Sequence, residues 1–354
     1  MRILYAFLFA LLFLISANLQ AQTPELDNLL EEGIRLHDAG DFNGAIAKYD
    51  EMLEAEPENF GAQAEKSMSQ FMARDYEKCI DLCEHIIKIH KEEESLYLVY
   101  TTLGNALDNA GKPQEAIDAY ERGIEKFPDH YMLHFNLGVT YLREGETEKG
   151  IKSLVDDLRT NPHHPGGNYA LGVALASQNK RSLALMALCR FMMLEVGTNR
   201  NALAFGLITE ILGGNAEKTG RKSQTITLSM PPEEGEADDL SAVDLMIDIL
   251  SLAEDDKKLK KLNKKLDPAE RMSNSIGSLF GVAGELYGKG DVEGPISDLY
   301  IPFFIALDEK EFTLPLCYVI HSYEGDKNVE KWLEENIETV EEMIRWSFEE
   351  GEND

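Results

Sequence analysis

A position that is usually glycine recurs at intervals of 34 residues in the first part of this chain, with one interval three residues longer. We call this position the slot. The residues in this slot are, in order, Gly33, Ser67, Gly104, Gly138, Gly172 and Gly206. Twelve residues after the slot, each of the first five repeats has a small or apolar residue: Ala45, Cys79, Ala116, Gly150 and Ala184. Repetition at this period is typical of a stacked solenoid, in which each repeat buries its apolar face against its neighbours.

Each repeat is predicted to form two helices. In the third repeat, one helical stripe consists of Tyr100, Leu103, Gly104 and Leu107. A second stripe lies between Pro113 and Pro128 and consists of Ala116, Tyr120 and Gly123. Glycine inside a helix costs about 1 kcal/mol relative to alanine. Gly104 therefore indicates close approach of the second helix, at a small residue such as Ala116.

The pattern resembles the tetratricopeptide repeat, a family of helix–turn–helix units. Two repeats carry its small, small, aromatic and proline slots in full: Gly33, Ala45, Tyr49 and Pro57, then Gly104, Ala116, Tyr120 and Pro128. The fourth and fifth repeats supply Leu137, Gly138, Tyr141, Gly150 and Pro162, then Leu171, Gly172, Leu175, Ala184 and Leu188. The resemblance covers residues 26 to about 198, and Gly206 indicates the first helix of a sixth repeat.

The pattern ends at Leu212. Residues 213–241 contain paired glycines, paired prolines and an acidic run, which predict a linker or long loop with a short strand at 225–230. Helical periodicity returns from Ala242, and later helices are predicted at 268–287, 295–308, 311–323 and 327–348. We therefore predict an all-α fold, with a tetratricopeptide-like helical solenoid of five repeats and the start of a sixth at 22–212, followed by a helical C-terminal domain at 242–354.

The first 21 residues have the character of a secretory signal peptide. Arg2 precedes 13 uninterrupted apolar residues, which are too few for the roughly 20 that span a bilayer. No cysteine lies near the expected cleavage site, so a lipid anchor on cysteine is not expected. We expect an exported chain that begins near Gln22 and is periplasmic or extracellular.

The chain is strongly acidic, with 64 Asp and Glu against 34 Lys and Arg and a formal net charge of −30. Such a surface repels phosphate backbones and anionic headgroups, so neither nucleic-acid binding nor membrane contact is expected. The exception is a lysine-rich amphipathic stretch at 257–265. We interpret its lysines as a solvated face, and the alternative is contact with a membrane surface or an anionic partner.

Four cysteines are too few for a disulfide framework in a chain of 354 residues. Cys79 and Cys83 lie four residues apart on one predicted helix face, in slots that face inward. We interpret them as buried small apolar residues, and a bridge between them is the alternative.

No motif predicts catalysis, a metal or a cofactor. His130 and His134 have the spacing of helical metal ligands, and His163 and His164 lie in another turn between repeats. No Glu or Cys completes a ligand set nearby, so polar turn residues are the preferred interpretation. Nucleophile-elbow, zinc-protease and phosphate-loop motifs are missing as well. We therefore predict a non-enzymatic protein, and the alternative is an unrecognised activity in the C-terminal domain, positioned by the repeats.

The resemblance implies a concave groove lined by the first helix of each repeat. Its side chains would be Leu30, Ile34, Met68, Thr101, Asn105, Phe135, Asn136, Val139, Tyr169 and Val173. Some family members grip a peptide's terminal carboxylate there, but the basic slots for that clamp hold Thr101, Gly166 and Ala170. The apolar strip at 135, 139, 169 and 173 either receives a partner segment or is covered by the chain's own later helices.

These observations predict a protein–protein interaction scaffold or adaptor of the cell envelope, which binds a segment of a protein partner in the groove. A purely structural array that bridges the subunits of an envelope assembly is a further alternative.

Overall fold

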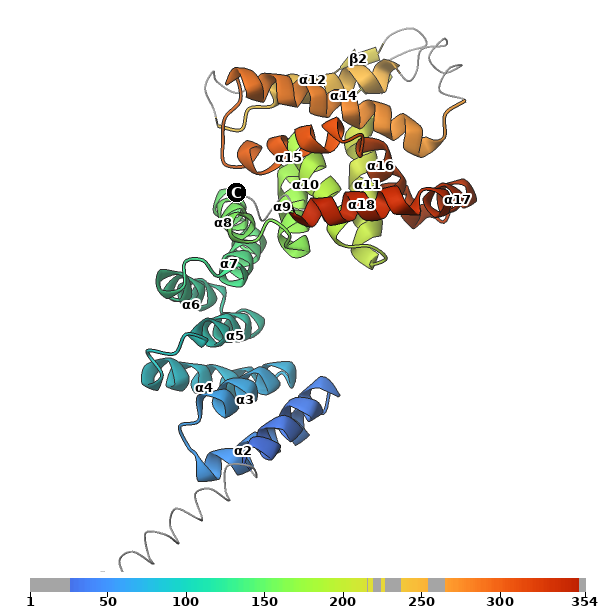
Figure 1. Ribbon diagram of the computed structural model, residues 1–354. Helices are drawn as coiled ribbons and strands as arrows, with labels where there is room; N and C mark the ends of the chain where they lie inside the picture. The colour runs from blue at the N-terminus through green and yellow to red at the C-terminus, as the bar shows by residue number, and fades with distance from the viewer. Residues whose placement is uncertain (1–25, 215, 219–223, 227–236, 254–264, 350–354) are drawn as a thin grey trace, which may run out of the picture. The chain divides into compact units, whose positions relative to one another are not determined.

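A computed structural model describes residues 26–214, 216–218, 224–226, 237–253 and 265–349. These residues are almost entirely helical, so the predicted all-α class is confirmed (Figure 1). The predicted signal peptide lies outside the described residues. Among the described helices, none is long and apolar enough to cross a bilayer. The chain divides into two compact units, an N-terminal unit that ends at Thr140 and a C-terminal unit that begins at Tyr141.

The N-terminal unit is a succession of antiparallel helix pairs. It contains a helix over residues 26–38, α2 (Phe42–Ala55), α3 (Phe60–Met72), α4 (Tyr76–Ile89), α5 (Leu96–Asn109), α6 (Pro113–Lys126) and the first ten residues of α7 (Tyr131–Arg143). From α2 to α6, each helix packs on the next one along the chain. This is the arrangement that the repeats predict.

Turn residues fix where these helices begin and end. The side chain of Asp41 accepts a hydrogen bond from the Gly44 N–H at the start of α2, and Asn59 does the same for the Ala62 N–H at the start of α3. Between α5 and α6, Gly111 has a φ of +77°, a conformation that side-chain-bearing residues rarely adopt. Pro113 then occupies the first turn of α6, where its missing N–H is not needed.

The slot glycines allow the two helices of a pair to approach closely. A Cβ built at position 104 would overlap the ring of Tyr120, and a Cβ at position 33 would overlap the ring of Tyr49. The predicted close approach is therefore present, but the side chain that requires it is Tyr120 rather than Ala116. The aromatic ring of the second helix packs directly against the bare backbone of the first.

The C-terminal unit contains the last repeats and all later elements. Its elements are α8 (Thr147–Thr160), α9 (Pro165–Ser177), α10 (Arg181–Leu194), α11 (Asn199–Gly213), β1 (Ala216–Lys218), β2 (Gln224–Ile226), α12 (Ser241–Ala253), α14 (Pro268–Lys289), α15 (Ser297–Glu309), α16 (Thr313–His321), a 3₁₀ turn (Ser322–Glu324), α17 (Lys327–Glu335) and α18 (Ile337–Glu349). All four later predicted helical segments contain helices, and the segment at 327–348 is two helices separated at Asn336.

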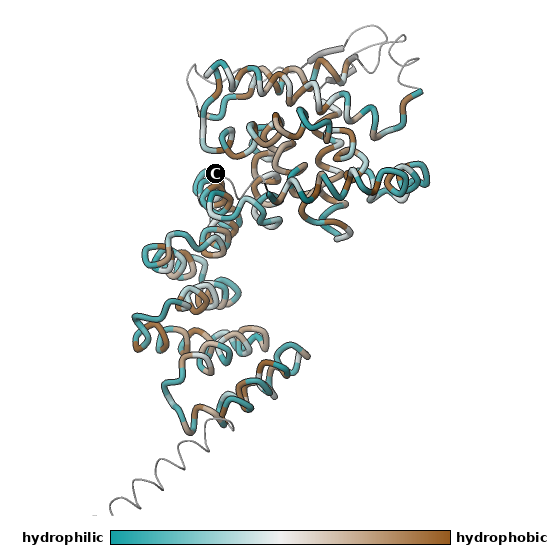
Figure 2. The backbone as a smooth tube through the Cα atoms, viewed as in Figure 1, coloured by the Kyte–Doolittle hydropathy of each residue, from teal (hydrophilic) through white to brown (hydrophobic). Residues whose placement is uncertain are grey.

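Helix α10 forms the centre of this unit. Every residue from Arg181 to Met193 is buried. Helices α9 and α11 pack against α10, and so do α12, α15, α16 and α18 from the C-terminal region (Figures 1 and 2). A helix that is apolar on all sides must be surrounded, which explains why one core joins the repeats to the later helices.

The compact units therefore differ from the predicted domain division. The sequence predicts a boundary at the linker 213–241, whereas the last repeats and the C-terminal helices share the core around α10. Within the predicted linker, β1 and β2 pair antiparallel with Glu217 opposite Thr225, and β2 overlaps the start of the predicted strand. Residues 227–236, and the lysine-rich stretch apart from the exposed Lys265, lie outside the described residues.

Helix α11 lies where the sequence predicts the first helix of a sixth repeat. Helix α11 begins at a capping box formed by Thr198 and Asn201. Beside Gly206, in contrast, there is no atom within 4 Å of the position that a Cβ would occupy. The slot glycine of α11 therefore lacks the close neighbour that Gly104 has.

Candidate functional site

The ten predicted groove residues all lie on the first helix of a repeat, and none is buried. Ile34 and Val173 are exposed, at 36% and 37% of their accessible surface, and the other eight are partly exposed. Five of the ten lie on α5 and α7 in the N-terminal unit: Thr101, Asn105, Phe135, Asn136 and Val139. Half-exposed side chains in a row of this kind form a surface that a partner can contact.

Contacts at two levels hold α5 and α7 side by side. At one end, the ring of Tyr97 stacks on His130, with 3.8 Å between centroids. At the other end, the Thr140 hydroxyl donates to the carboxylate of Asp108 over 3.5 Å. The five groove residues of these helices lie between the two contacts, so they form one continuous face. We call this the α5–α7 face.

Two amides give the α5–α7 face its polar character. The Tyr120 hydroxyl donates to Asn105 Oδ1 over 2.7 Å, which fixes the orientation of that amide. Burial raises the pKa of Tyr120, so the phenol remains a neutral donor. Among the described residues, no acceptor lies within reach of the enclosed Asn136 Nδ2. An unsatisfied donor of this kind costs about 1–3 kcal/mol.

In the C-terminal unit, the two predicted groove residues differ in their surroundings. Tyr169 packs on Phe191 with 5.0 Å between ring centroids, and the Arg200 guanidinium lies 5.7 Å from the centre of its ring. Val173 remains exposed, because the C-terminal helices pack on α10 rather than over it. In this unit the later helices therefore leave Val173 uncovered, and Tyr169 has a structural role in addition to its place in the row.

The four histidines singled out in the sequence take part in local contacts. His134 bonds to the carbonyl of Pro128 over 2.7 Å, and His130 lies in the stack with Tyr97. His163 bonds to the carbonyl of Ser347 over 3.1 Å, and His164 to the buried carboxylate of Asp157 over 2.9 Å. Within the part of the chain that the structure describes, no group of three potential metal ligands converges.

The paired cysteines are reduced and buried. Their sulfur atoms lie 4.0 Å apart. The hydrogen bond with Cys79 and burial both raise the pKa of the Cys83 thiol well above its usual value. Both residues therefore have the predicted role of small core residues.

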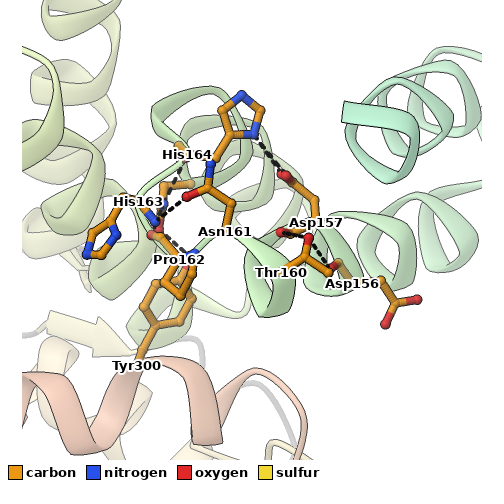
Figure 3. A network of polar contacts seen from close by, with 9 residues as sticks. Asp156, Asp157, Thr160, Asn161, Pro162, His163, His164 and Tyr300 are labelled. Atoms are coloured by element: carbon orange, nitrogen blue, oxygen red, sulfur yellow. Dashed lines mark hydrogen bonds and ion pairs between the residues drawn. The ribbon is translucent and has the colours of Figure 1, made fainter. Parts of the chain in front are cut away.

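A polar network that the sequence does not reveal surrounds Asn168, at the start of α9. Figure 3 shows the turn residues Pro162 and His164 and, beside them, Tyr300 of α15. The amide nitrogen of Asn168 donates to the carbonyls of Pro162 and His164, over 3.1 and 3.0 Å. Its oxygen accepts a hydrogen bond of 2.9 Å from the hydroxyl of Tyr300 on α15. The network therefore fastens the α8–α9 turn to a helix more than a hundred residues later.

A cavity of about 300 Å³ lies beside this network, between α8, α10 and α15. Its walls include the apolar side chains of Leu158, Leu299 and Phe303 and the charged side chains of Arg159, Arg190 and Asp298. Sequence reasoning missed the cavity because its walls come from distant segments, and no local motif marks such a site. The sequence signal for this site is a single charged residue, Arg190, within the apolar run of α10.

Comparison with known proteins agrees with these observations. The sequence model of the tetratricopeptide repeat family matches residues 101–165. Small glutamine-rich tetratricopeptide repeat-containing protein 2 of Mycosarcoma maydis is 26% identical over 114 residues, which are 32% of this chain and 32% of that protein. The peroxisomal targeting signal receptor of Saccharomyces cerevisiae is 31% identical over 71 residues, which are 20% of this chain and 11% of the receptor. The chain thus spans a third or less of the length of these relatives.

Among solved structures, a thermophilic tetratricopeptide repeat protein of Thermus thermophilus superposes with a TM-score of 0.44 at 16% identity. The alignment covers 52% of this chain and 99% of that structure. The successive helix pairs and the row of partly exposed side chains along their first helices are those of a helical repeat protein. The family model identifies tetratricopeptide repeats at residues 101–165, which confirms the resemblance drawn from the sequence.

Proposed function

We propose that this chain is a non-enzymatic scaffold of the cell envelope, which binds an extended or helical segment of a protein partner on the α5–α7 face. Tetratricopeptide repeats are protein-interaction modules, which supports the general role. The observation that carries the site is the continuous row of half-exposed side chains between the Tyr97–His130 stack and the Thr140–Asp108 hydrogen bond.

The chemistry of this face favours a largely uncharged segment. Phe135 and Val139 offer apolar contact, and the neighbouring Asn105 and Asn136 are uncharged amides. The positions at which a carboxylate clamp would need basic residues include Thr101, whose hydroxyl donates to the carbonyl of Tyr97 instead. Recognition through side-chain packing and main-chain hydrogen bonds is consistent with this composition.

Site-specific photo-crosslinking tests the proposed face. A photoreactive amino acid at position 139 should crosslink a partner, whereas the same residue at the exposed Asp118 on α6 should not. The variant Val139→Glu should weaken partner binding about 5- to 150-fold, which corresponds to about 1–3 kcal/mol at a contact in the centre of an interface. Equal crosslinking from both positions, with the Val139→Glu variant folded and binding normally, would remove this face from consideration.

The envelope location rests on the predicted signal peptide at residues 1–21. Sequencing the N-terminus of the chain recovered from cell fractions tests it. A mature chain that begins near Gln22 in the exported fraction supports the proposal, and an intact Met1 in the cytoplasm contradicts it.

A further inference from the structure

Arg190 lines the cavity between α8, α10 and α15, and no carboxylate of the described residues acts on its charge; the nearby ionisable group is the Tyr300 hydroxyl. The residue is only 4% exposed. One of its nitrogens, Nη2, donates to the carbonyl of Ser347 over 2.6 Å. The other, Nη1, is enclosed and has no acceptor in the part of the chain that the structure describes. A buried guanidinium without a paired carboxylate is stabilised by an anion placed beside it.

The surroundings of Arg190 compensate its charge only in part. The face of Phe303 lies 4.1 Å from the guanidinium carbon, which gives a cation–π contact. Burial lowers the pKa of Arg190 to about 10, so the group still carries its charge at neutral pH.

The other charged groups of the cavity limit what an anion could be. Asp298 is exposed and accepts a hydrogen bond of 3.1 Å from the Tyr287 hydroxyl. Arg159 is also exposed and pairs with Asp156 at 3.6 Å. Because Arg159 is already paired, the positive charge left for an anion is that of Arg190, and a single negative charge is the best match. The Asn168 amide is already engaged by its three hydrogen bonds, so the guanidinium of Arg190 remains as the group that would recognise an anion in the cavity.

We infer that this cavity binds a monocarboxylate with an apolar body, with the carboxylate on Arg190 and the body against Leu158, Leu299 and Phe303. The cavity volume of about 300 Å³ is at the lower end of small-molecule sites, which span about 300–1,000 Å³. Two sources supply this chemistry: a free aliphatic acid, or the C-terminal carboxylate of a peptide that ends in an apolar residue. This site lies in the C-terminal unit and does not depend on the α5–α7 face.

Calorimetric titration of the full chain tests the inference with four probes. Octanoate and N-acetyl-leucine represent the two sources, and octanamide and N-acetyl-leucinamide are their uncharged counterparts. At least one acid should bind about tenfold or more tightly than its amide, because a charge-assisted hydrogen bond to Arg190 is lost with the charge. Preference for octanoate identifies a free acid as the ligand, and preference for N-acetyl-leucine identifies a chain terminus.

Three variants connect binding to this cavity. Arg190→Met should abolish the preference for acid over amide. Leu299→Trp should block both acids by filling the cavity without altering the guanidinium, and it keeps the test informative if Arg190→Met does not fold. Arg122→Met, at an exposed arginine of the N-terminal unit, should leave binding unchanged. Binding of neither acid at millimolar concentration, equal binding of acids and amides, or unchanged binding by the folded Arg190→Met and Leu299→Trp variants would overturn the inference.

Discussion

Arg181, the first residue of α10, forms a bidentate ion pair with Asp248 in the middle of α12, with nitrogen–oxygen distances of 2.6 and 3.0 Å. Both side chains are buried, at 9% and 2% exposure. The neighbouring carboxylate of Asp244 accepts hydrogen bonds from the backbone N–H groups of Arg181 and Ser182, over 3.3 and 2.7 Å. A C-terminal helix thus caps the start of a repeat helix, and the two parts of the chain fold around one core.

The ion pair gives the first prediction. Arg181→Met removes the guanidinium that pairs with the buried carboxylate of Asp248, so the free energy of unfolding should fall by about 3–5 kcal/mol. Chemical denaturation monitored by circular dichroism measures this loss. The control is Arg122→Met, which removes the exposed pair with Glu84 and should cost less than about 1 kcal/mol. Similar losses for the two variants would mean that the α10–α12 contact contributes little.

The second prediction concerns the slot glycine of the third repeat. Gly104→Ala forces a Cβ into the ring of Tyr120, so we expect a loss of about 1–3 kcal/mol through overpacking. Gly206→Ala places a methyl group in open space in the middle of α11, and should stabilise that helix by about 0.5–1 kcal/mol. Thermal melts of the two variants beside the parent chain check both signs. A Gly104→Ala variant as stable as the parent would show that the helix pair adjusts freely.

The periodic features of this fold could be predicted from the sequence. In the third repeat, one apolar stripe includes Gly104, a second includes Tyr120, and a turn separates them. The helix pairs and their order therefore follow from local pattern alone. The partner of Gly104 could not be identified in the same way. Ala116 and Tyr120 lie one turn apart on the same face, and only the packed structure decides which of them meets the glycine.

The core around α10 and the cavity beside it depend on contacts between distant segments. The run from Leu183 to Met193 has no polar stripe, which in retrospect indicates a helix buried on every side. The helices that bury it include α18, which follows much later in the chain and carries no repeat signature. Arg190 is a charged residue inside that run, and its contacts come from distant segments: its guanidinium donates to the Ser347 carbonyl and lies over the ring of Phe303.

The third prediction concerns the hydrogen bond between Tyr300 and Asn168. Tyr300→Phe leaves the buried Oδ1 of Asn168 without its donor, so we expect a loss of about 1–3 kcal/mol in unfolding free energy. Tyr287→Phe is the matched control, because that hydroxyl bonds to the exposed Asp298 and water can replace it. Urea denaturation of both variants tests the difference, and a loss for Tyr287→Phe as large as that for Tyr300→Phe would contradict the proposed importance of the Asn168 network.

The fourth prediction follows from the division of the chain into two compact units. A fragment from Gln22 to Arg143 retains the packed helix pairs of the N-terminal unit and should remain a soluble, cooperatively folding helical protein. A fragment from Gln22 to Leu212 contains all the repeats but removes α12, α15, α16 and α18 from around α10. Exposure of that apolar surface should cause the longer fragment to associate or to lose helicity.

Size-exclusion chromatography and circular dichroism of the two fragments distinguish these outcomes. The comparison is informative because the longer fragment has more complete repeats, so a solenoid stabilised only by contacts between neighbouring repeats would make it the more stable of the two. A monomeric Gln22–Leu212 fragment that melts at least as high as the shorter one would show that α10 does not need the C-terminal helices. Association of the longer fragment would instead establish that those helices complete the repeat array, with the Arg181–Asp248 pair joining the two parts.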